Sequence, residues 1–362
     1  MKINFIKKFV VLAAVSAMVL FQSCQKDPDP VIKAGADGFF VVNEGSYGNS
    51  NSSVSFYDRK TNTMTNNVFA VKNGRPLGDQ SQSMTVFEGK GYIVVQNSSK
   101  VEVINADDFS SVATIIDGVP SPRYFLGISS TKAYVSDWGV NGITGTVKVI
   151  DLTTYKVTKT IATGKGANRM LKVGNLVYVT NTGGFDKDNT IKVIDSSTDA
   201  ITASITTGDN PNSLQSDKAG NIWVASSGAI AYNTDFTINE ANSTKGSISK
   251  ITSNNTEALR LSVSKVTFSS PANLGVSPDG TKIYYTYEGA VYAMSTTATS
   301  LPATAFKTMS YYGLAVDPFN GNIIGCSAPN FSAAGSIDVY DAAGALLTSY
   351  NVGIAPNGCA FK

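Results

Sequence analysis

The 362-residue sequence contains no histidine. This absence excludes Ser-His-Asp and Cys-His nucleophilic arrangements, histidine-ligated metals and imidazole general bases. An enzyme built on this chain would have to use carboxylates with a metal or a cofactor, and the sequence shows no paired acid cluster. We therefore expect no catalytic residues, no resident cofactor and no enzymatic activity. A histidine-free enzyme remains as an alternative.

We also expect no calcium site, although one segment partly matches the pattern of a calcium-binding loop. Asp186 and Asp188 have the spacing of the first two ligands of a calcium loop. Ile191 stands where such a loop needs glycine, and no bidentate acid follows. We expect this segment to be a solvated loop, and we expect no metal site.

Charge is scarce in this chain. Charged residues make up 15% of the sequence, and the formal net charge is +2. Proteins that bind nucleic acids concentrate Lys and Arg in a basic patch, which is the footprint of phosphate binding. The sequence has no cluster of Lys and Arg interleaved with aromatic residues, so it disfavours a nucleic-acid partner.

Long hydrophobic runs are limited to the first residues. An apolar run from Phe9 to Phe21 follows Lys2, Lys7 and Lys8. A basic start followed by a short apolar run is typical of a secretory signal peptide, and this run is too short to span a bilayer comfortably. We expect residues 1–23 to be a signal peptide that is absent from the mature protein.

Cysteine occurs only three times, and its first position is informative. The residues LFQSC, which end at Cys24, resemble the lipobox of bacterial lipoproteins. The resemblance implies that Cys24 carries a lipid anchor. The alternative is a signal peptide that merely ends near a cysteine.

A polar tether follows, over residues 24–36, and Pro28 and Pro30 keep it extended. Its order Cys-Gln-Lys-Asp resembles the export signal that sends Bacteroidetes lipoproteins to the outer leaflet of the outer membrane. This resemblance implies a position at the cell surface. A solvated linker would have a similar composition.

Cys326 and Cys359 are the other two cysteines. They lie in strands that the repeat pattern places in neighbouring units. In an exported protein they could form a disulfide bond. Each has small apolar neighbours, however, and buried free cysteines are common. Both alternatives stay open.

One unit recurs about every 45 residues over residues 37–362. The clearest copy, LVYVTN…TIKVID…ITASITT, alternates apolar and polar residues with a period of two, which indicates β-strands. The first strand of each unit is expected at Ser83–Glu88, Tyr124–Ser129, Met170–Val173, Ser213–Asp217, Asn273–Ser277, Gly313–Asp317 and Asn357–Phe361.

The order of strands predicts a closed ring. The unit that begins at Phe39 lacks a first strand, and the chain ends on a surplus strand, NGCAFK. The C-terminal strand is therefore expected to complete the N-terminal unit, which removes exposed sheet edges. The sequence predicts a single all-β domain, a seven-bladed β-propeller with four-stranded blades. The fifth unit is interrupted by a long insertion from Gly228 to Ser247, and loops of this length are usually functional or mobile.

The connectors between units and the loops after the second strands should crowd around one mouth of the central channel. The connectors supply neutral hydrogen-bonding groups, two cations and three stacking surfaces. We predict ligand-binding roles there for Gln80, Asn212, Asn273, Asn357, Arg123, Arg169, Tyr124, Tyr311 and Tyr312. The alternative for any one Asn or Arg is that it satisfies a buried carbonyl group beside the channel.

The loops after the second strands carry aromatic residues among Ser, Gly and Asn, a composition typical of adaptable recognition surfaces. Exposed aromatic residues lower solubility unless a partner covers them. We predict that these aromatic residues contact a ligand, and they are Tyr47, Trp138, Phe185, Tyr232 and Phe331, with Phe236 beside them in the insertion.

The motifs VYVTN…NTIKVID…TASITTG…PNSL resemble the YVTN-type propeller repeat. The segment NEGSYGNSNSSVSFYD resembles the opening blade of surface-layer-like propeller lipoproteins of Bacteroidetes. Within that group LGDQSQSMTVFEGKGYIVVQNS, SPRY, YYGLAVDP and VGIAPNGCAFK look like the BtuG-type lipoproteins. That resemblance implies capture of cobalamin or a related corrinoid at the cell surface for vitamin B12 uptake, beside a TonB-dependent transporter.

The residue types at the mouth do not select this ligand by themselves. A corrin ring would fit aromatic faces and amide groups, and so would an oligosaccharide. A protein-interaction or glycan-binding scaffold of the cell envelope is the alternative function.

Overall fold

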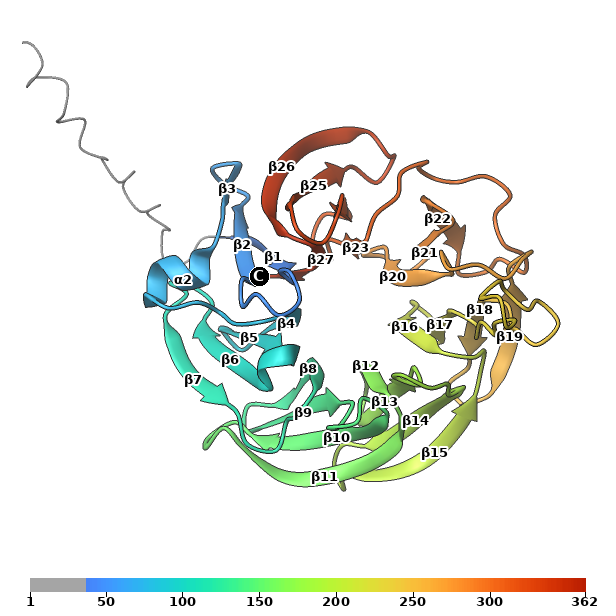
Figure 1. Cartoon of the computed structure of the whole chain (residues 1–362), viewed down its shortest axis with the longest axis horizontal. Coiled ribbons are helices and arrows are strands. Elements are labelled where there is room, and N and C mark those ends of the chain that lie inside the picture. Colours follow the sequence, from blue (N-terminus) through green and yellow to red (C-terminus); the bar gives the residue numbers. More distant parts are fainter. Residues whose placement is uncertain (1–36) are drawn as a thin grey trace, which may run out of the picture. The chain divides into compact units, whose positions relative to one another are not determined.

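The computed structural model describes residues 37–362, which form seven antiparallel sheets arranged in a ring around a central channel (Figure 1). The chain is therefore a seven-bladed β-propeller, as the repeat predicts. The expected signal peptide, Cys24 and the tether lie outside the described residues. Among residues 37–362, no helix is long and apolar enough to cross a membrane.

Blades are numbered here along the chain, and their strands run from the channel outwards. The first four contain these strands: blade 1, β27 (Pro356–Phe361), β1 (Gly38–Asn43), β2 (Ser53–Asp58) and β3 (Thr63–Thr65); blade 2, β4 (Ser81–Phe87), β5 (Lys90–Val95), β6 (Lys100–Asn105) and β7 (Ser111–Ile115); blade 3, β8 (Pro122–Ser129), β9 (Lys132–Asp137), β10 (Thr144–Asp151) and β11 (Lys156–Lys165); blade 4, β12 (Ala167–Val173), β13 (Leu176–Asn181), β14 (Thr190–Asp195) and β15 (Ala200–Thr206).

The remaining three contain these strands: blade 5, β16 (Pro211–Ser216), β17 (Ile222–Ser226), β18 (Ser247–Ile251) and β19 (Glu257–Ser262); blade 6, β20 (Ala272–Val276), β21 (Lys282–Tyr287) and β22 (Ala290–Ser295); blade 7, β23 (Gly313–Val316), β24 (Ile323–Ser327), β25 (Ala334–Tyr340) and β26 (Leu346–Ile354). All seven expected first strands are inner strands.

Blade 6 has three strands where the others have four. In the place of an outer strand, Lys307 forms an isolated antiparallel bridge with Val291 of β22, and the Val291 amide donates to the Lys307 carbonyl at 2.8 Å. The outer edge of this blade is therefore reduced to a single bridge in the connector that leads to β23.

The ring closes as the sequence predicts. The C-terminal strand β27 pairs antiparallel with β1, in a register that runs from Phe39 opposite Phe361 to Val42 opposite Gly358. The last residues of the chain thus supply the inner strand of the first blade. This pairing leaves no free inner edge between the ends of the chain.

The hydrophobic core lies between neighbouring blades, because apolar side chains of one sheet pack against those of the next. Between blades 2 and 3, the Tyr92 and Phe125 rings stack with centroids 3.8 Å apart. Between blades 7 and 1, one buried cluster contains both Cys326 and Cys359, which are free thiols. The hydrogen bond with Cys326 and burial raise the pKa of the Cys359 thiol.

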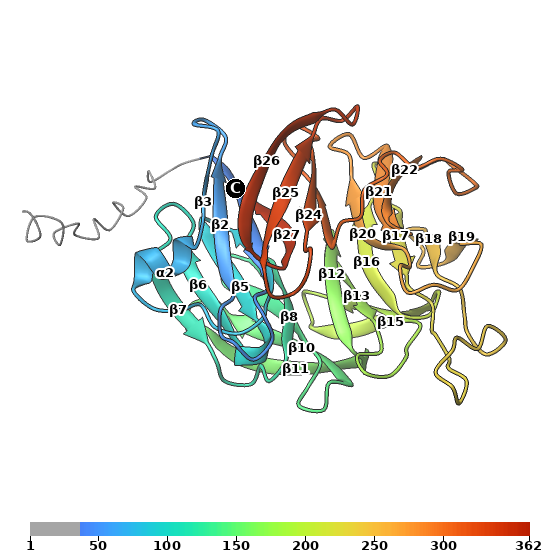
Figure 2. The same ribbon diagram turned by 45° about the horizontal axis from the view of Figure 1, so that its top comes forward.

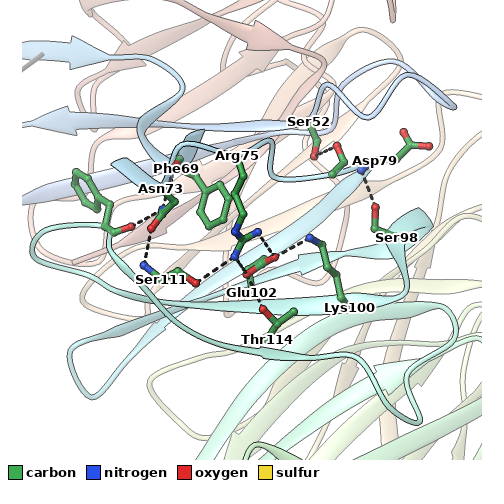
Figure 3. A network of polar contacts seen from close by, with 12 residues as sticks. Ser52, Phe69, Asn73, Arg75, Asp79, Ser98, Lys100, Glu102, Ser111 and Thr114 are labelled. Carbon is green, nitrogen blue, oxygen red and sulfur yellow. Dashed lines mark hydrogen bonds and ion pairs between the residues drawn. The ribbon is translucent and has the colours of Figure 1, made fainter. Parts of the chain in front are cut away.

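A short helix, α2 (Val68–Asn73), lies in the connector between blades 1 and 2 and was not predicted from the sequence. Figure 3 shows how this connector is fastened to blade 2. Arg75 donates to both carboxylate oxygens of the buried Glu102, at 2.8 and 2.9 Å, and its guanidinium lies 4.8 Å from the Phe69 ring centroid. Lys100 and Thr114 also donate to Glu102, at 2.6 and 3.1 Å. The network therefore holds the connector that leads into the inner strand β4.

Candidate functional site

One backbone hydrogen bond recurs in five blades and defines the end of the channel called here the channel mouth. In each case the amide of the first residue after the second strand donates to the carbonyl of the residue directly before the inner strand, at 2.8–3.0 Å. The pairs are Glu44 to Ala355, Gln96 to Gln80, Trp138 to Ser121, Thr182 to Gly166 and Ser227 to Asn210. The connectors and the second-strand loops therefore meet at this end, as predicted. Figure 2 shows the loops after β9 and β17 projecting from the same side of the ring.

Arg123 and Arg169 differ from the other arginines in their charged partners. Three of the five arginines of the chain, Arg59, Arg75 and Arg260, are in ion pairs with carboxylates. Within residues 37–362, neither Arg123 nor Arg169 has such a partner. Both lie at the start of neighbouring inner strands, β8 and β12, at the channel mouth.

Each of these two guanidinium groups is stacked on an aromatic ring. Arg123 lies 3.9 Å from the Trp138 ring centroid, and its Nη1 donates to Gln96 Oε1 at 2.6 Å. Arg169 lies 4.2 Å from the Tyr124 ring centroid, and its Nε is buried without a hydrogen-bond partner among the described residues. Stacking holds the planar groups in place while leaving N–H donors for a further acceptor.

Glu44 is the carboxylate nearest to this arrangement, and sequence reasoning missed it. It is the first residue after β1, at the position that Gln96 and Trp138 hold in blades 2 and 3. Tyr312 Oη donates to Glu44 Oε2 at 3.0 Å, and Asn357 Nδ2 donates to Oε1 at 2.8 Å. The signal in the sequence was the acidic residue directly after the strand FFVVN.

Burial sets the electrostatics of the mouth. It raises the pKa of Glu44, while the hydrogen bonds from Asn357 and Tyr312 and the charge of Arg123 oppose that rise. Burial also lowers the pKa of Arg123, which still remains protonated because guanidinium pKa values lie far above neutral pH. Burial, with the charge of Glu44, raises the pKa of Tyr312, so its hydroxyl stays neutral. A site of two cations and one hydrogen-bonded carboxylate results.

The structure brings together six residues, called here the mouth cluster. They are Glu44, Arg123, Tyr124, Trp138, Arg169 and Tyr312, and all except Glu44 were predicted. Two more predicted aromatic residues extend the cluster outwards. Phe185 meets Trp138 edge to face at 6.0 Å, and Phe331 meets Tyr312 edge to face at 5.1 Å.

Two further predicted aromatic residues lie on loops around the mouth. Tyr47 is 72% exposed on the loop after β1, and this loop is tied to the loop after β24 by the Ser46 hydroxyl, which donates to the Phe331 carbonyl at 2.7 Å. Tyr232 lies in the insertion between β17 and β18, which contains the isolated bridge between Tyr232 and Ile238. Tyr232 stacks on Phe268 of the next connector, with centroids 6.4 Å apart. Tyr232 therefore links the insertion of blade 5 to the connector that leads to blade 6.

The three predicted asparagines fasten neighbouring inner strands. Asn212 donates to the Pro271 carbonyl at 2.9 Å and Asn273 to the Tyr312 carbonyl at 3.1 Å. Asn357 donates to the Ser81 and Gln82 carbonyls at 3.2 and 2.9 Å. These amide donors have the structural role that was the alternative in the sequence, and they brace the mouth rather than leave donors free for a ligand.

One predicted residue lies elsewhere than expected, and a second lies at the mouth but outside the inner strand. Tyr311 is buried in the core between blades 6 and 7, where its hydroxyl meets Tyr340 at 2.6 Å and donates to Asp338 at 2.7 Å, so its ring is not a surface for stacking. Gln80 occupies a turn with φ of 54°. Gln82, two residues later, takes the inner-strand position, and its Nε2 donates to Tyr124 Oη at 3.3 Å.

The acidic pair Asp186 and Asp188 is engaged by the protein itself. Asp186 pairs with Lys165 at 2.5 Å, and Asp188 accepts from the backbone amides of Lys165 and Thr190, both at 2.9 Å. Among residues 37–362, no group of three acidic, cysteine or histidine side chains is placed to hold a metal ion.

Below the channel mouth, a cavity of about 390 Å³ occupies the channel. Inner strands of all seven blades line it, and Tyr124 and Arg169 of the mouth cluster are among its walls. The mouth cluster and the channel therefore form one continuous hollow in the middle of the ring.

Residues 37–355 match the model of a family described as Domain of unknown function (DUF5074). No curated protein matches the chain.

Among solved structures, a quinonprotein alcohol dehydrogenase-like protein of Bacteroides thetaiotaomicron is similar, with a TM-score of 0.65 and 17% identity over 90% of this chain and 78% of that one. A putative 6-phosphogluconolactonase of Bacteroides fragilis has a TM-score of 0.63 and 14% identity over 90% and 98% of the two chains. A functionally unknown protein of Desulfotomaculum acetoxidans has a TM-score of 0.66 and 13% identity over 90% and 99%. At these identities the likeness supports the fold alone.

Proposed function

The chain belongs to the DUF5074 family, whose description assigns no activity, and we propose that it is a ligand-binding propeller that captures cobalamin or a related corrinoid at the channel mouth. The observation that carries the proposal is the pair Arg123 and Arg169. Two guanidinium groups without carboxylate partners, each stacked on an aromatic ring at the opening of a cavity, suit a ligand rich in hydrogen-bond acceptors.

A corrinoid has the chemistry that this surface would recognise. Its amide side chains and phosphate offer acceptors for Arg123 and Arg169, and its ring offers an apolar face to Trp138 and to the rim of exposed aromatic residues. Tyr312 and Phe331 are 42% and 55% exposed, so they are accessible to a ligand. The resemblance of YYGLAVDP and VGIAPNGCAFK to BtuG-type lipoproteins selects a corrinoid over a sugar.

Binding without chemical conversion is part of the proposal. The mouth cluster offers guanidinium, phenol, indole and one carboxylate, and that carboxylate is already hydrogen-bonded by Tyr312 and Asn357. These groups are suited to orient a ligand. In the proposed setting, a lipid on Cys24 holds the protein at the outer membrane, facing the cell surface, and the ligand passes to a TonB-dependent transporter.

The test is a calorimetric titration of cyanocobalamin into the purified full-length protein in detergent. Saturable binding near one to one, with a dissociation constant on the order of nanomolar, would support corrinoid capture. An absence of heat at several temperatures and at about micromolar protein would reject it. Titration of oligosaccharides would then follow.

A second candidate function, as a docking platform for an envelope protein, is favoured by one observation. Phe236, Phe268 and Tyr232 are 86%, 70% and 53% exposed, in the insertion of blade 5 and the connector that leads to blade 6. Exposed aromatic residues of this kind often contact a protein partner. Replacement of all three by Ser should abolish co-purification of a TonB-dependent transporter if they contact it. An unchanged yield of the transporter would remove this surface from the proposal.

A further inference from the structure

The channel below the mouth changes character along its length. Inner strands begin at the mouth, so the first residues of each strand lie near the opening and later residues lie deeper. Polar groups line the opening, and they are Gln82, Tyr124, Arg169, Asn273 and Asn357. The deeper wall is mainly apolar, with Leu126, Val276, Val316 and Phe361. Its polar side chains, Thr85 and Gln215, donate to the carbonyls of Phe125 and Leu274, at 3.0 and 3.2 Å.

The channel wall is open beside Gly358 of β27, which directly follows Asn357 of the opening. A Cβ atom built on Gly358 would meet no atom within 4 Å, and this glycine lines the cavity. The other lining glycine, Gly275, differs, since a Cβ there would lie 2.5 Å from Val316 Cγ2. The free space of the channel therefore adjoins Gly358, and a group of the ligand could occupy it.

We propose that the channel is a second compartment of the ligand site, which receives a compact apolar group that the ligand carries on an acceptor-bearing linker. This inference rests on the proposed function and deepens it. Arg169 stands at the opening with its guanidinium free of carboxylates, so it binds the acceptor of the linker as the linker enters. The apolar group then contacts the wall of Leu126, Val276 and Val316.

Occupation of the channel by an apolar group of the ligand is favourable for a simple physical reason. Water against an apolar wall forms few hydrogen bonds with it, so replacing that water by an apolar group is favourable. The volume of about 390 Å³ falls within the range of small-molecule pockets. A benzimidazole ring on a ribose phosphate arm, which cobalamin carries below its corrin ring, combines an apolar bicycle with an anionic linker. The channel therefore suits this nucleotide arm, and the corrin ring remains at the channel mouth.

The experiment compares two corrinoids on the purified full-length protein by calorimetry. Cyanocobalamin has the nucleotide arm, and dicyanocobinamide has the corrin ring without it. We expect the wild-type protein to bind cyanocobalamin at least about tenfold more tightly than dicyanocobinamide. Gly358→Leu fills the open space without meeting protein atoms at its Cβ, so it should remove the preference and leave dicyanocobinamide affinity unchanged.

Ala162→Leu is the matched control, because it introduces the same side chain on the exposed face of the outer strand β11. It should keep the wild-type preference. Equal affinities for the two corrinoids in the wild-type protein, or a preference that survives Gly358→Leu, would overturn the channel compartment while leaving corrinoid capture in place. An absence of binding by either corrinoid would overturn the proposed function and this inference together.

Discussion

Trp138 and Tyr312 are the single residues whose side chains test the channel mouth most directly. Trp138 carries the ring under Arg123, and Tyr312 is a partly exposed phenol bonded to Glu44. Replacing either with Ala should weaken cyanocobalamin binding by about 1–3 kcal/mol, as for aromatic anchors in a desolvated site. Titration calorimetry measures the change. Phe319→Ala is the control, since this ring is 67% exposed in the turn after β23, at the other end of the inner strands. Unchanged affinity in both mouth variants would move the site to another face.

Glu102 allows a test of stability that is independent of the ligand. Burial by itself would raise its pKa, but the hydrogen bonds and charges of Arg75 and Lys100 lower that pKa below the usual 4.5. A carboxylate with a lowered folded-state pKa stabilises the fold above the unfolded-state pKa, and this contribution is lost as the pH falls through the folded-state value. Glu102→Gln should therefore lower the free energy of unfolding at pH 7 by about 1–3 kcal/mol, and the difference from wild type should shrink towards about pH 3.

Denaturant unfolding at the two pH values measures this difference. Glu257→Gln is the matched control, because Glu257 pairs with the partly exposed Arg260 on the outer strand β19. Its effect at pH 7 should stay below about 1 kcal/mol. A Glu102→Gln variant as stable as wild type at pH 7 would show that the α2 connector does not depend on this network.

Gln82 was missed and Tyr311 was misplaced in the sequence analysis, for two different physical reasons. The register of the inner strands shifts near their first residues, for example between Ser81 and Ser83 in β4. Such a bulge changes which of two nearby residues faces the channel, so Gln82 was missed and Gln80 was chosen. Tyr311 and Tyr312 are neighbours on opposite faces, and one of them is buried. Period-two patterns identify strands, but they do not locate bulges.

Among the elements, β27 and the insertion between β17 and β18 differ in their importance for folding. We expect the loss of β27 to disrupt the fold and the loss of the insertion to leave it intact. Deleting residues 356–362 removes the inner strand of blade 1 and exposes the edge of β1. Replacing residues 229–245 with a short Gly-Ser turn should spare the sheet, because β17 and β18 still pair from Ser226 opposite Ser247. Circular dichroism during heating should show a cooperative transition only in the second variant. A cooperative transition in the first would mean that closure by β27 is dispensable.

The elements also differ in how well they could be predicted from the sequence. The strands were predictable because alternating apolar and polar residues recur along the chain, and Tyr-Val and Val-Ile-Asp mark the strands most clearly in the third and fourth units. The helix α2 has only six residues, and its capping residues Asn67 and Gly74 are both in left-handed conformations. A helix this short is stabilised by packing, here of the buried Val68 and Phe69. No local sequence pattern therefore predicted it. The missing outer strand of blade 6 likewise depends on contacts across the fold.

At the scale of the whole molecule, ring closure was predictable and the ligand was not. Seven inner strands, of which the last is the surplus strand at the C-terminus, determine the closed ring by counting. The ligand depends on which loop side chains converge, and that information lies in three-dimensional contacts such as Arg123 on Trp138. A propeller scaffold supports many functions, so a fold-level likeness carries none of them over.

The last prediction concerns attachment to the membrane, which the proposed transfer to a transporter requires. The lipid acceptor proposed here is Cys24, which precedes the propeller of residues 37–362. Each buried methylene group of an acyl chain contributes about 0.8 kcal/mol to membrane binding, so losing the acylated thiol should release the protein. Cys24→Ser should therefore move the protein from the membrane fraction to the soluble fraction, while Gln25→Ala should remain with the membrane. Because the mouth cluster lies within the propeller, released Cys24→Ser protein should bind cyanocobalamin as wild type does in detergent. Cys24→Ser protein that stays membrane-bound would place the anchor elsewhere in the chain.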